Sequence, residues 1–160
     1  MANISRLRAD RPGEVELFYI RLKTHSDNRL FELSEKAQTE RSAASTASLA
    51  QIVADELVIA ALKRGIHLDQ WAIIPGAVQA LIFVQESRPG LEASTDKPRL
   101  LTSFVAGFKA ATAKRINLIR NQPGSPVWQR SYDAQRVDDE FMLARLRQRI
   151  ATAEDAVISS

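Results

Sequence analysis

The feature that most restricts the fold is a pair of apolar segments, "IHLDQWAII" at 66–74 and "VQALIFV" at 78–84, joined through Pro75 and Gly76. Short segments rich in β-branched and aromatic residues are typical of strands, and a proline followed by a glycine favours a turn. We therefore expect a β-hairpin in the middle of the chain.

The N-terminal half adds a strand and a helix. Residues 15–24, "VELFYIRLKT", alternate between apolar and polar positions, which predicts a half-buried strand. From Leu49 the apolar residues recur at helical spacing, and Gly65 stands where it would stop that helix. The small-residue stretch "SAASTAS" at 42–48 fits either a loose linker or a capped helix start.

The C-terminal half is expected to hold two more helices. Residues 86–98 are polar with two prolines and a glycine, so they predict a loop. The helix at 99–121 then begins after Pro98, and "QPGSP" breaks it. One face of that helix is apolar and comprises Leu101, Phe104, Val105, Phe108, Thr112, Ile116 and Ile119. Residues 127–137 could form a short strand, and Asp138 is placed to cap a last helix at 139–157.

This order of elements predicts an α+β sandwich, in which helices pack on a small, largely antiparallel sheet of the ferredoxin-like kind. At 160 residues the chain is expected to form a single domain, with flexible tails at 1–14 and 154–160.

Several classes of protein are disfavoured by composition. No run of eighteen apolar residues exists and the N-terminus lacks the apolar core of a secretory signal, so we expect a cytoplasmic chain without a membrane partner. The absence of cysteine excludes disulfides and thiolate zinc sites. The only histidines, His25 and His67, are far apart in sequence, so no metal and no other cofactor is expected.

Positive charge is concentrated in the last third of the chain. Residues 98–150 hold ten Lys and Arg against four Asp and Glu, a balance of +6, whereas residues 1–97 hold twelve against thirteen. A basic region on a near-neutral body is typical of a surface that binds polyanions, although a solvated basic helix surface has the same composition.

Four segments in this order resemble one family, the single-tyrosine HUH transposases, particularly the branch associated with repetitive extragenic palindromes. They are "YIRLKTHSDNRLF" at 19–31, "LDQWAIIPGAVQALIFV" at 68–84, "FVAGFKAATAKRINLIRNQPGSPVWQRSYDAQRVDDE" at 104–140 and "FMLARLRQRI" at 141–150. The resemblance covers roughly residues 15–153 and implies the HUH transposase-like form of the sandwich. In that family two histidines hold a divalent metal and a tyrosine hydroxyl attacks the scissile phosphate.

The positions that carry this chemistry hold other residues here. The two metal-ligand positions correspond to Ala77 and Gln79, and Gly76 replaces the asparagine of the turn. Alanine has no donor atom, and a glutamine carbonyl is a weak ligand beside an imidazole. The nucleophile position corresponds to Arg149, which cannot act as an oxygen nucleophile, and Ala153 stands where the family has asparagine. The resemblance therefore implies a fold that has lost its catalytic groups, and we expect no enzymatic activity.

Other residues could in principle supply a site. Tyr132, beside Asp133, is a candidate for a rebuilt nucleophile, although packing or a hydrogen bond at a strand edge explains a tyrosine there as well. Tyr19 alternates with Phe18 in the first strand, which favours a structural role. The acids at 138–140 could suggest a metal cluster, but a helix N-terminus explains them more simply.

The sequence thus predicts a catalytically inactive, domesticated transposase-like protein, with a regulatory role, that binds a DNA hairpin or single-stranded DNA, RNA being left open. Trp128 and Tyr132, in "VWQRSY", are the expected stacking residues, and Arg149 is expected where the scissile phosphate lay. The expected phosphate contacts are Lys109, Lys114, Arg115, Arg120, Arg130 and Arg136.

Two alternatives stay open. The chain could be an interaction or assembly subunit whose basic face meets an acidic protein partner, and the resemblance also implies that it could form a homodimer by sheet pairing. The other alternative is an active DNA strand-transferase that uses Tyr132 and a divalent metal.

Overall fold

A five-stranded antiparallel sheet lies between two helical layers in the computed structural model, which describes residues 15–27, 30–31, 40–85 and 99–160. The strand order is β4-β1-β3-β2-β5. The strands are β1 (Val15–Lys23), β2 (His67–Ile74), β3 (Ala77–Gln85), β4 (Asp133–Arg136) and β5 (Ile158–Ser159). The predicted α+β sandwich is confirmed.

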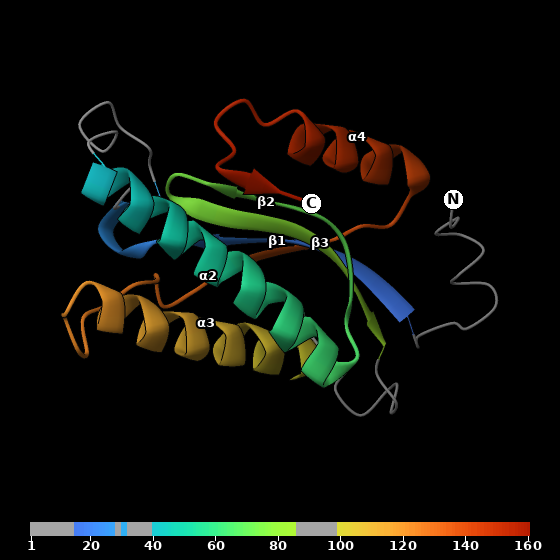
Figure 1. Ribbon diagram of the computed structural model, residues 1–160. Helices are drawn as coiled ribbons and strands as arrows, with labels where there is room; N and C mark the ends of the chain where they lie inside the picture. The colour runs from blue at the N-terminus through green and yellow to red at the C-terminus, as the bar shows by residue number, and fades with distance from the viewer. Residues whose placement is uncertain (1–14, 28–29, 32–39, 86–98) are drawn as a thin grey trace.

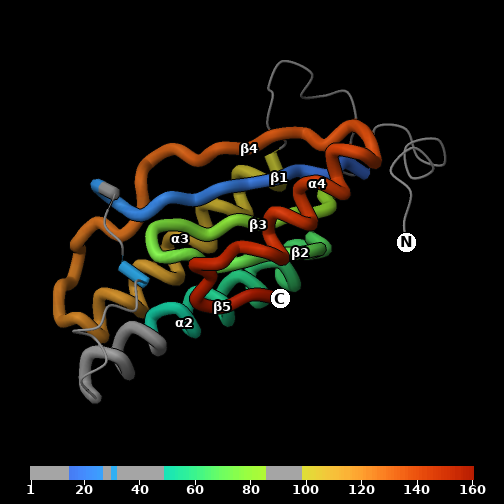
Figure 2. The backbone as a smooth tube through the Cα atoms, turned by 90° about the horizontal axis from the view of Figure 1, so that it is seen from above, coloured from blue at the N-terminus to red at the C-terminus, as the bar shows by residue number. Residues whose placement is uncertain are grey.

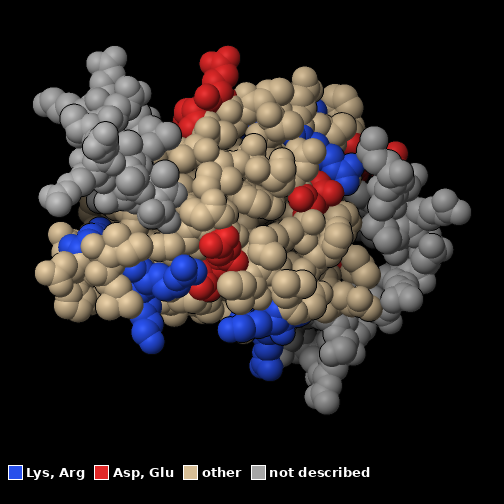
Figure 3. Space-filling view, viewed as in Figure 1, with Lys and Arg blue, Asp and Glu red and all other residues tan. Residues whose placement is uncertain are grey.

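Two helices cover one face of this sheet and one helix covers the other. Helices α2 (Glu40–Arg64) and α3 (Arg99–Ile119) form the first layer, which we call the helical face (Figure 1). Helix α4 (Glu140–Ala151) crosses the opposite side, which we call the α4 face (Figure 2). A short 3-10 helix, η1 (His25–Asp27), follows β1. Figure 3 has the same view as Figure 1, with α4 above the sheet and α2 and α3 below it.

Strand alternation divides the core between these two faces. In β1, Phe18, Ile20 and Leu22 belong to the cluster under α2 and α3, whereas Leu17 packs in the cluster under α4. Because side chains of a strand alternate between faces, Tyr19 shares the α4 face with Leu17, and Arg21 and Lys23 follow on the same side.

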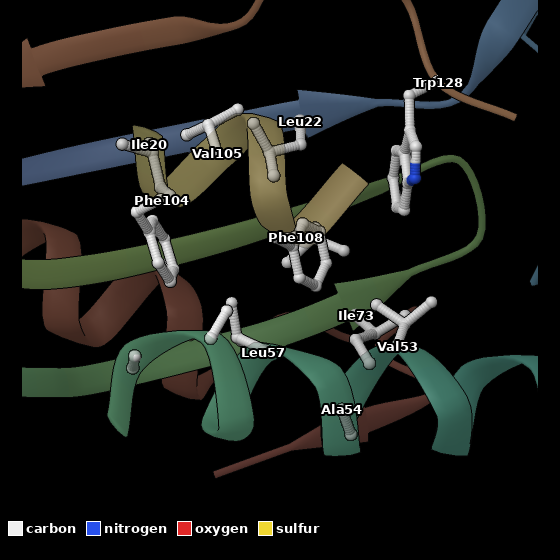
Figure 4. Packing of buried hydrophobic residues seen from close by; sticks show 14 of the residues in the cluster. Ile20, Leu22, Val53, Ala54, Leu57, Ile73, Phe104, Val105, Phe108 and Trp128 are labelled. Carbon is white, nitrogen blue, oxygen red and sulfur yellow. The ribbon is translucent and has the colours of Figure 1, made fainter. Parts of the chain in front are cut away.

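Strand β3 is buried on both faces, which explains its nearly continuous apolar sequence. The larger cluster, under α2 and α3, packs Val53 and Leu57 of α2 against Phe104 and Phe108 of α3 (Figure 4). The apolar face predicted for α3 is buried except at its end, where Ile119 is 48% exposed and the preceding turn buries Asn117 instead.

The predicted hairpin is confirmed, with Ile74 opposite Ala77 across the Pro75–Gly76 turn. The backbone N–H of Thr24 donates to the Gly76 carbonyl over 3.0 Å, which ties the turn to the end of β1. Gly65 ends α2 as expected, with a positive φ of 63° that favours glycine. No helix among the described residues is long and apolar enough to cross a membrane.

Some boundaries differ from the prediction. Residues 42–48 lie inside α2, so the linker interpretation is wrong. Helix α4 ends at Ala151, and its cap is Asp139, whose side chain accepts a 2.7 Å hydrogen bond from the Met142 N–H, whereas Asp138 was the expected cap. The strand expected at 127–137 is reduced to β4. The expected tail at 154–160 includes β5, which pairs with β2. The expected tail at 1–14 and loop at 86–98 lie outside the described residues.

Helix α4 is anchored to the sheet by a paired charge as well as by apolar contacts. Arg147 donates from Nε and Nη2 to the Asp69 carboxylate of β2, at 2.8 and 2.9 Å. This hydrogen bonding raises the pKa of Arg147 above its ordinary value. Two parallel N–H···O bonds from one guanidinium fix orientation as well as distance. The pair therefore holds the outer side of α4 against β2.

A buried hydrogen bond joins α3 to the segment that precedes β4. The indole Nε1 of Trp128 donates to Thr112 Oγ1 over 2.8 Å, and the same hydroxyl donates to the Phe108 carbonyl over 2.8 Å. Trp128 and Thr112 are both buried. The Thr112 hydroxyl thus accepts one hydrogen bond and donates another, so the polar groups of both buried side chains have a partner.

Thr112→Val should lower the free energy of unfolding by about 1–3 kcal/mol, because valine keeps the shape but leaves the buried Trp128 N–H without its acceptor. Thr102→Val, at an exposed position of the same helix, should change it by less than about 0.5 kcal/mol. Urea unfolding of both variants measures the difference, and equal stabilities would contradict this account of Trp128.

Asp69→Asn should also destabilise the fold, by about 1–3 kcal/mol, because it leaves the largely buried guanidinium of Arg147 without its anion. Asp133→Asn is the matched control, since the Asp133 side chain is 72% exposed and its ion pair with Lys23 spans 3.8 Å. Thermal unfolding monitored by circular dichroism compares the two; a loss in the control as large as in Asp69→Asn would rule out an anchoring role.

Candidate nucleic-acid interface

A groove runs between α4 and β4 on the α4 face. Its volume is about 480 Å³. One wall is Gln135 of β4 and the other is α4. We call it the α4 groove. It is lined by Gln135, Met142, Arg145, Leu146, Gln148, Arg149 and Thr152. Two guanidinium groups, two amides and a hydroxyl therefore surround an apolar strip formed by Met142 and Leu146.

Strand β1 adds two cations beside this groove. Gln135 of the groove lies opposite Tyr19 in the sheet, and Arg21 and Lys23 are the next residues of β1 on the same face. Arg21 is exposed. Asp133, opposite Arg21 on β4, is the acid of this region and pairs with Lys23 at 3.8 Å. The α4 face thus combines Arg21, Lys23, Arg145 and Arg149 with Asp133 of β4, while further acids lie at the two ends of α4, Asp139 and Glu140 at its start and Glu154 and Asp155 after its end.

The family's metal-ligand positions, Ala77 and Gln79, also belong to the α4 face, but both are buried, at 2% and 5% exposure. The Gln79 carbonyl oxygen accepts a 2.7 Å hydrogen bond from the Tyr19 hydroxyl. The cross-strand neighbours of Gln79 and Ala77 on β1 are the cations Arg21 and Lys23. A methyl group, an occupied amide oxygen and two cations do not fit a divalent metal.

The histidines and the acids at 138–140 supply no metal site either. Among the described residues, no cluster of three or more His, Asp and Glu side chains could hold a metal ion. His25 is exposed in η1, and the His67 ring lies 5.6 Å from the ring of Phe83 at the other end of the hairpin. Asp139 caps α4, as a helix N-terminus predicts.

Most of the predicted phosphate contacts lie on the helical face, and several have structural partners. Lys109 donates to the carbonyls of Gln129 and Ser131, at 2.6 and 3.1 Å. Arg115 pairs with Glu56 of α2 at 3.0 Å. Arg120 donates to Asn117 Oδ1 over 2.8 Å and to the Pro126 carbonyl over 3.2 Å. These three cations hold α3 to its neighbours.

The predicted stacking residues do not lie in the groove. The Trp128 ring is buried between Phe31 and Phe108, so it is not available to stack on a base. Tyr132 is half-buried against the helical-face core, and its hydroxyl lies 3.3 Å from Thr102 Oγ1 of α3. Tyr132 is therefore on the other side of the sheet from Ala77 and Gln79, which does not favour a rebuilt nucleophile.

The remaining predicted contacts divide between the two faces. Lys114 and Arg130 are exposed on the α3 side. Arg136 pairs with Glu16 at 3.2 Å and lies over the Phe18 ring, on the helical face. Helix α3 itself holds no Asp or Glu, and Figure 3 shows Lys and Arg groups along its side of the molecule, with acidic groups above them. Of the nine predicted residues, only Arg149 lines the α4 groove, and the others lie on the helical face, so the structure does not bring the nine together on one surface.

Sequence reasoning missed Arg21, Lys23, Gln135 and Arg145. The period-two alternation of β1 carried a signal, because Arg21 and Lys23 share a face with Leu17 and Tyr19. The pairing of β4 with β1, which brings Gln135 opposite Tyr19, joins residues more than a hundred positions apart. No local pattern in the sequence indicates that register.

The fold is similar to solved transposase structures. One is a REP-associated tyrosine transposase bound to a REP hairpin, with a TM-score of 0.50, 12% sequence identity, 86% of this chain covered and 64% of that chain. Another is a candidate transposase from Deinococcus radiodurans R1, with a TM-score of 0.50, 20% identity, 86% of this chain covered and 89% of that chain.

The present chain thus spans a little under two thirds of the length of the first of these structures. No family model matches the sequence, and no curated protein matches it. At these identities the similarity concerns the fold, and the chain has a transposase-like α+β fold.

Proposed function

We propose that this chain binds structured single-stranded nucleic acid, such as a DNA hairpin, through the α4 face and does not cleave it. The observation that carries the proposal is the α4 groove, where Arg145 and Arg149 face Gln135 of β4 on a fold similar to that of a hairpin-bound transposase. Lys and Arg contacts to phosphates supply most of the non-specific affinity of nucleic-acid-binding proteins.

The charges of the α4 face support a polyanionic ligand. Arg145 and Arg149 are exposed on α4, and Arg21 is exposed on β1 beside them. The acid on the far side of α4, Asp69, is already paired with Arg147, so it adds no free negative charge there. The side of the molecule that α3 occupies fits less well, since its cations hold helices and loops together.

The chemistry of Ala77, Gln79 and Arg149 supports the part of the proposal that concerns the absence of cleavage. Gln79 is buried and its amide oxygen is engaged by Tyr19, while Ala77 offers no donor. Arg149, at the nucleophile position, has no hydroxyl. A guanidinium can bind a phosphate oxygen but cannot form a phosphate ester. Retention of the fold without these groups supports a binding protein, of domesticated and regulatory type.

Removal of both groove arginines should weaken hairpin binding. Fluorescence anisotropy with an imperfect DNA hairpin at about 50 mM salt should show tight binding by the native chain. In Arg145→Ala/Arg149→Ala the negative slope of log K against log salt should become shallower by about 1.5 to 2, because two phosphate contacts and their released counterions are lost.

The matched control is Lys114→Ala/Arg130→Ala, which removes two exposed cations from the α3 side and should leave the slope unchanged. A larger loss in this control would place the interface on the other side of the sheet. No binding to hairpin, single-stranded DNA or RNA, together with an absorbance spectrum free of nucleic acid after purification without nuclease, would favour the alternative of a protein-interaction subunit.

A labelled hairpin incubated with Mg²⁺ or Mn²⁺ should remain uncut, because Ala77 and Gln79 are poor metal ligands and Arg149 has no hydroxyl that could attack a phosphate. Denaturing electrophoresis checks this outcome. Metal-dependent nicking that disappears in Tyr132→Phe or in Tyr19→Phe, but persists in Arg149→Ala, would restore the interpretation as an active strand-transferase.

A further inference from the structure

One large apolar side chain on α4 has no place in the core. Phe141 is 74% exposed, whereas the larger apolar cluster buries Phe18, Phe31, Phe104 and Phe108. It lies in the first turn of α4, whose buried side is formed by Leu143, Leu146 and Ile150. Packing therefore does not explain a phenylalanine at this position.

Phe141 lies on the same side of α4 as the two groove arginines. Phe141, Arg145 and Arg149 are four residues apart, so they follow one another along one side of the helix with an axial spacing of about 6 Å. The guanidinium of Arg145 lies over the Phe141 ring, 5.9 Å from its centroid. This cation–π contact holds the ring next to a guanidinium plane.

The ring also lies next to side chains of the α4 groove. Its contact partner Arg145 and its sequence neighbour Met142 both line the groove. Figure 2 shows α4 starting near the end of β4 and crossing the sheet towards β5, and Phe141 precedes Arg145 and Arg149 along this helix. An exposed aromatic ring, the apolar strip of the groove and the two guanidinium groups thus lie next to one another along α4.

The charges around α4 give this line a polarity. Asp139 caps α4 and Glu140 precedes Phe141 in the first turn, and these carboxylates oppose a phosphate at the ring itself. Phosphates are favoured one and two turns later, at Arg145 and Arg149. A ligand that satisfies both ends has an uncharged flat group at Phe141 and an anionic backbone along the arginines.

We propose that Phe141 stacks on an unpaired base of the bound nucleic acid, so that the α4 groove takes a single-stranded segment next to a hairpin stem. The inference rests on the function proposed above and specifies its ligand. Bases within a duplex are stacked on each other and cannot reach a side chain in this way, whereas a splayed base stacks readily on an exposed ring.

Two hairpins with the same stem and loop test the proposal, one with a blunt end and one with a single-stranded overhang of several nucleotides. Phe141→Leu keeps an apolar side chain but removes the aromatic ring. It should weaken binding of the overhang hairpin about tenfold, since stacking contributes roughly 1–3 kcal/mol per base. Binding of the blunt hairpin should change less than about twofold, and Phe141→Trp should retain the affinity for the overhang.

Leu118→Ala is the matched control, because Leu118 is also 74% exposed but lies on α3, on the other side of the sheet. It should bind both hairpins like the native chain. If Phe141→Leu binds the overhang normally while Arg145→Ala/Arg149→Ala does not, stacking by Phe141 is refuted and nucleic-acid binding stands. Equal losses for blunt and overhang hairpins refute the single-stranded assignment. Failure of the native chain to bind either hairpin overturns the proposed function itself.

Discussion

The structure depends on the burial of β3 on both of its faces. A central strand whose side chains are apolar in both directions needs a packing layer above and below the sheet. Helices α2 and α3 form one layer and α4 forms the other, held by Leu143, Leu146 and Ile150. Because the sheet separates the two layers, cations on α3 and cations on α4 cannot form one surface, although they are close in sequence.

The two layers use their positive charges differently. Around α3, Lys109 and Arg120 donate to carbonyls of the loop that leads to β4, and Arg115 pairs with Glu56 of α2. On α4 only Arg147 is an anchor, through Asp69, while Arg145 and Arg149 face the groove. A side-chain cation that caps a helix or binds carbonyls has already exchanged its water for protein partners, so it gains less from a phosphate than an exposed one does. The number of Lys and Arg residues in the sequence therefore overstates the positive charge that is available to bind a phosphate.

The turn that precedes Ala77 and Gln79 is held by contacts within the protein. The strand-turn-strand of β2 and β3 is intact, with Ile74 opposite Ala77 and Thr24 bonded to Gly76. At its α4 face, the Tyr19–Gln79 hydrogen bond satisfies the polar groups that remain. A buried amide that is satisfied locally stabilises the sheet without a ligand. The groove next to it keeps its exposed arginines, and Phe141 extends that surface.

By itself the sequence determined most of the helices and strands, and it showed which chemical groups are absent from particular positions. Local periodicity predicted β1, the hairpin, and the helices α2 and α3, because these patterns depend on neighbours a few residues away. The identity of Ala77, Gln79 and Arg149 was likewise legible without a structure. Only the tertiary structure decided that Trp128 is a core residue bonded to Thr112, that α3 and α4 lie on opposite faces, and that Gln135 meets Arg145 across a groove. Those relations depend on the register of strands distant in sequence and on which helix covers which face, and no short-range pattern encodes either.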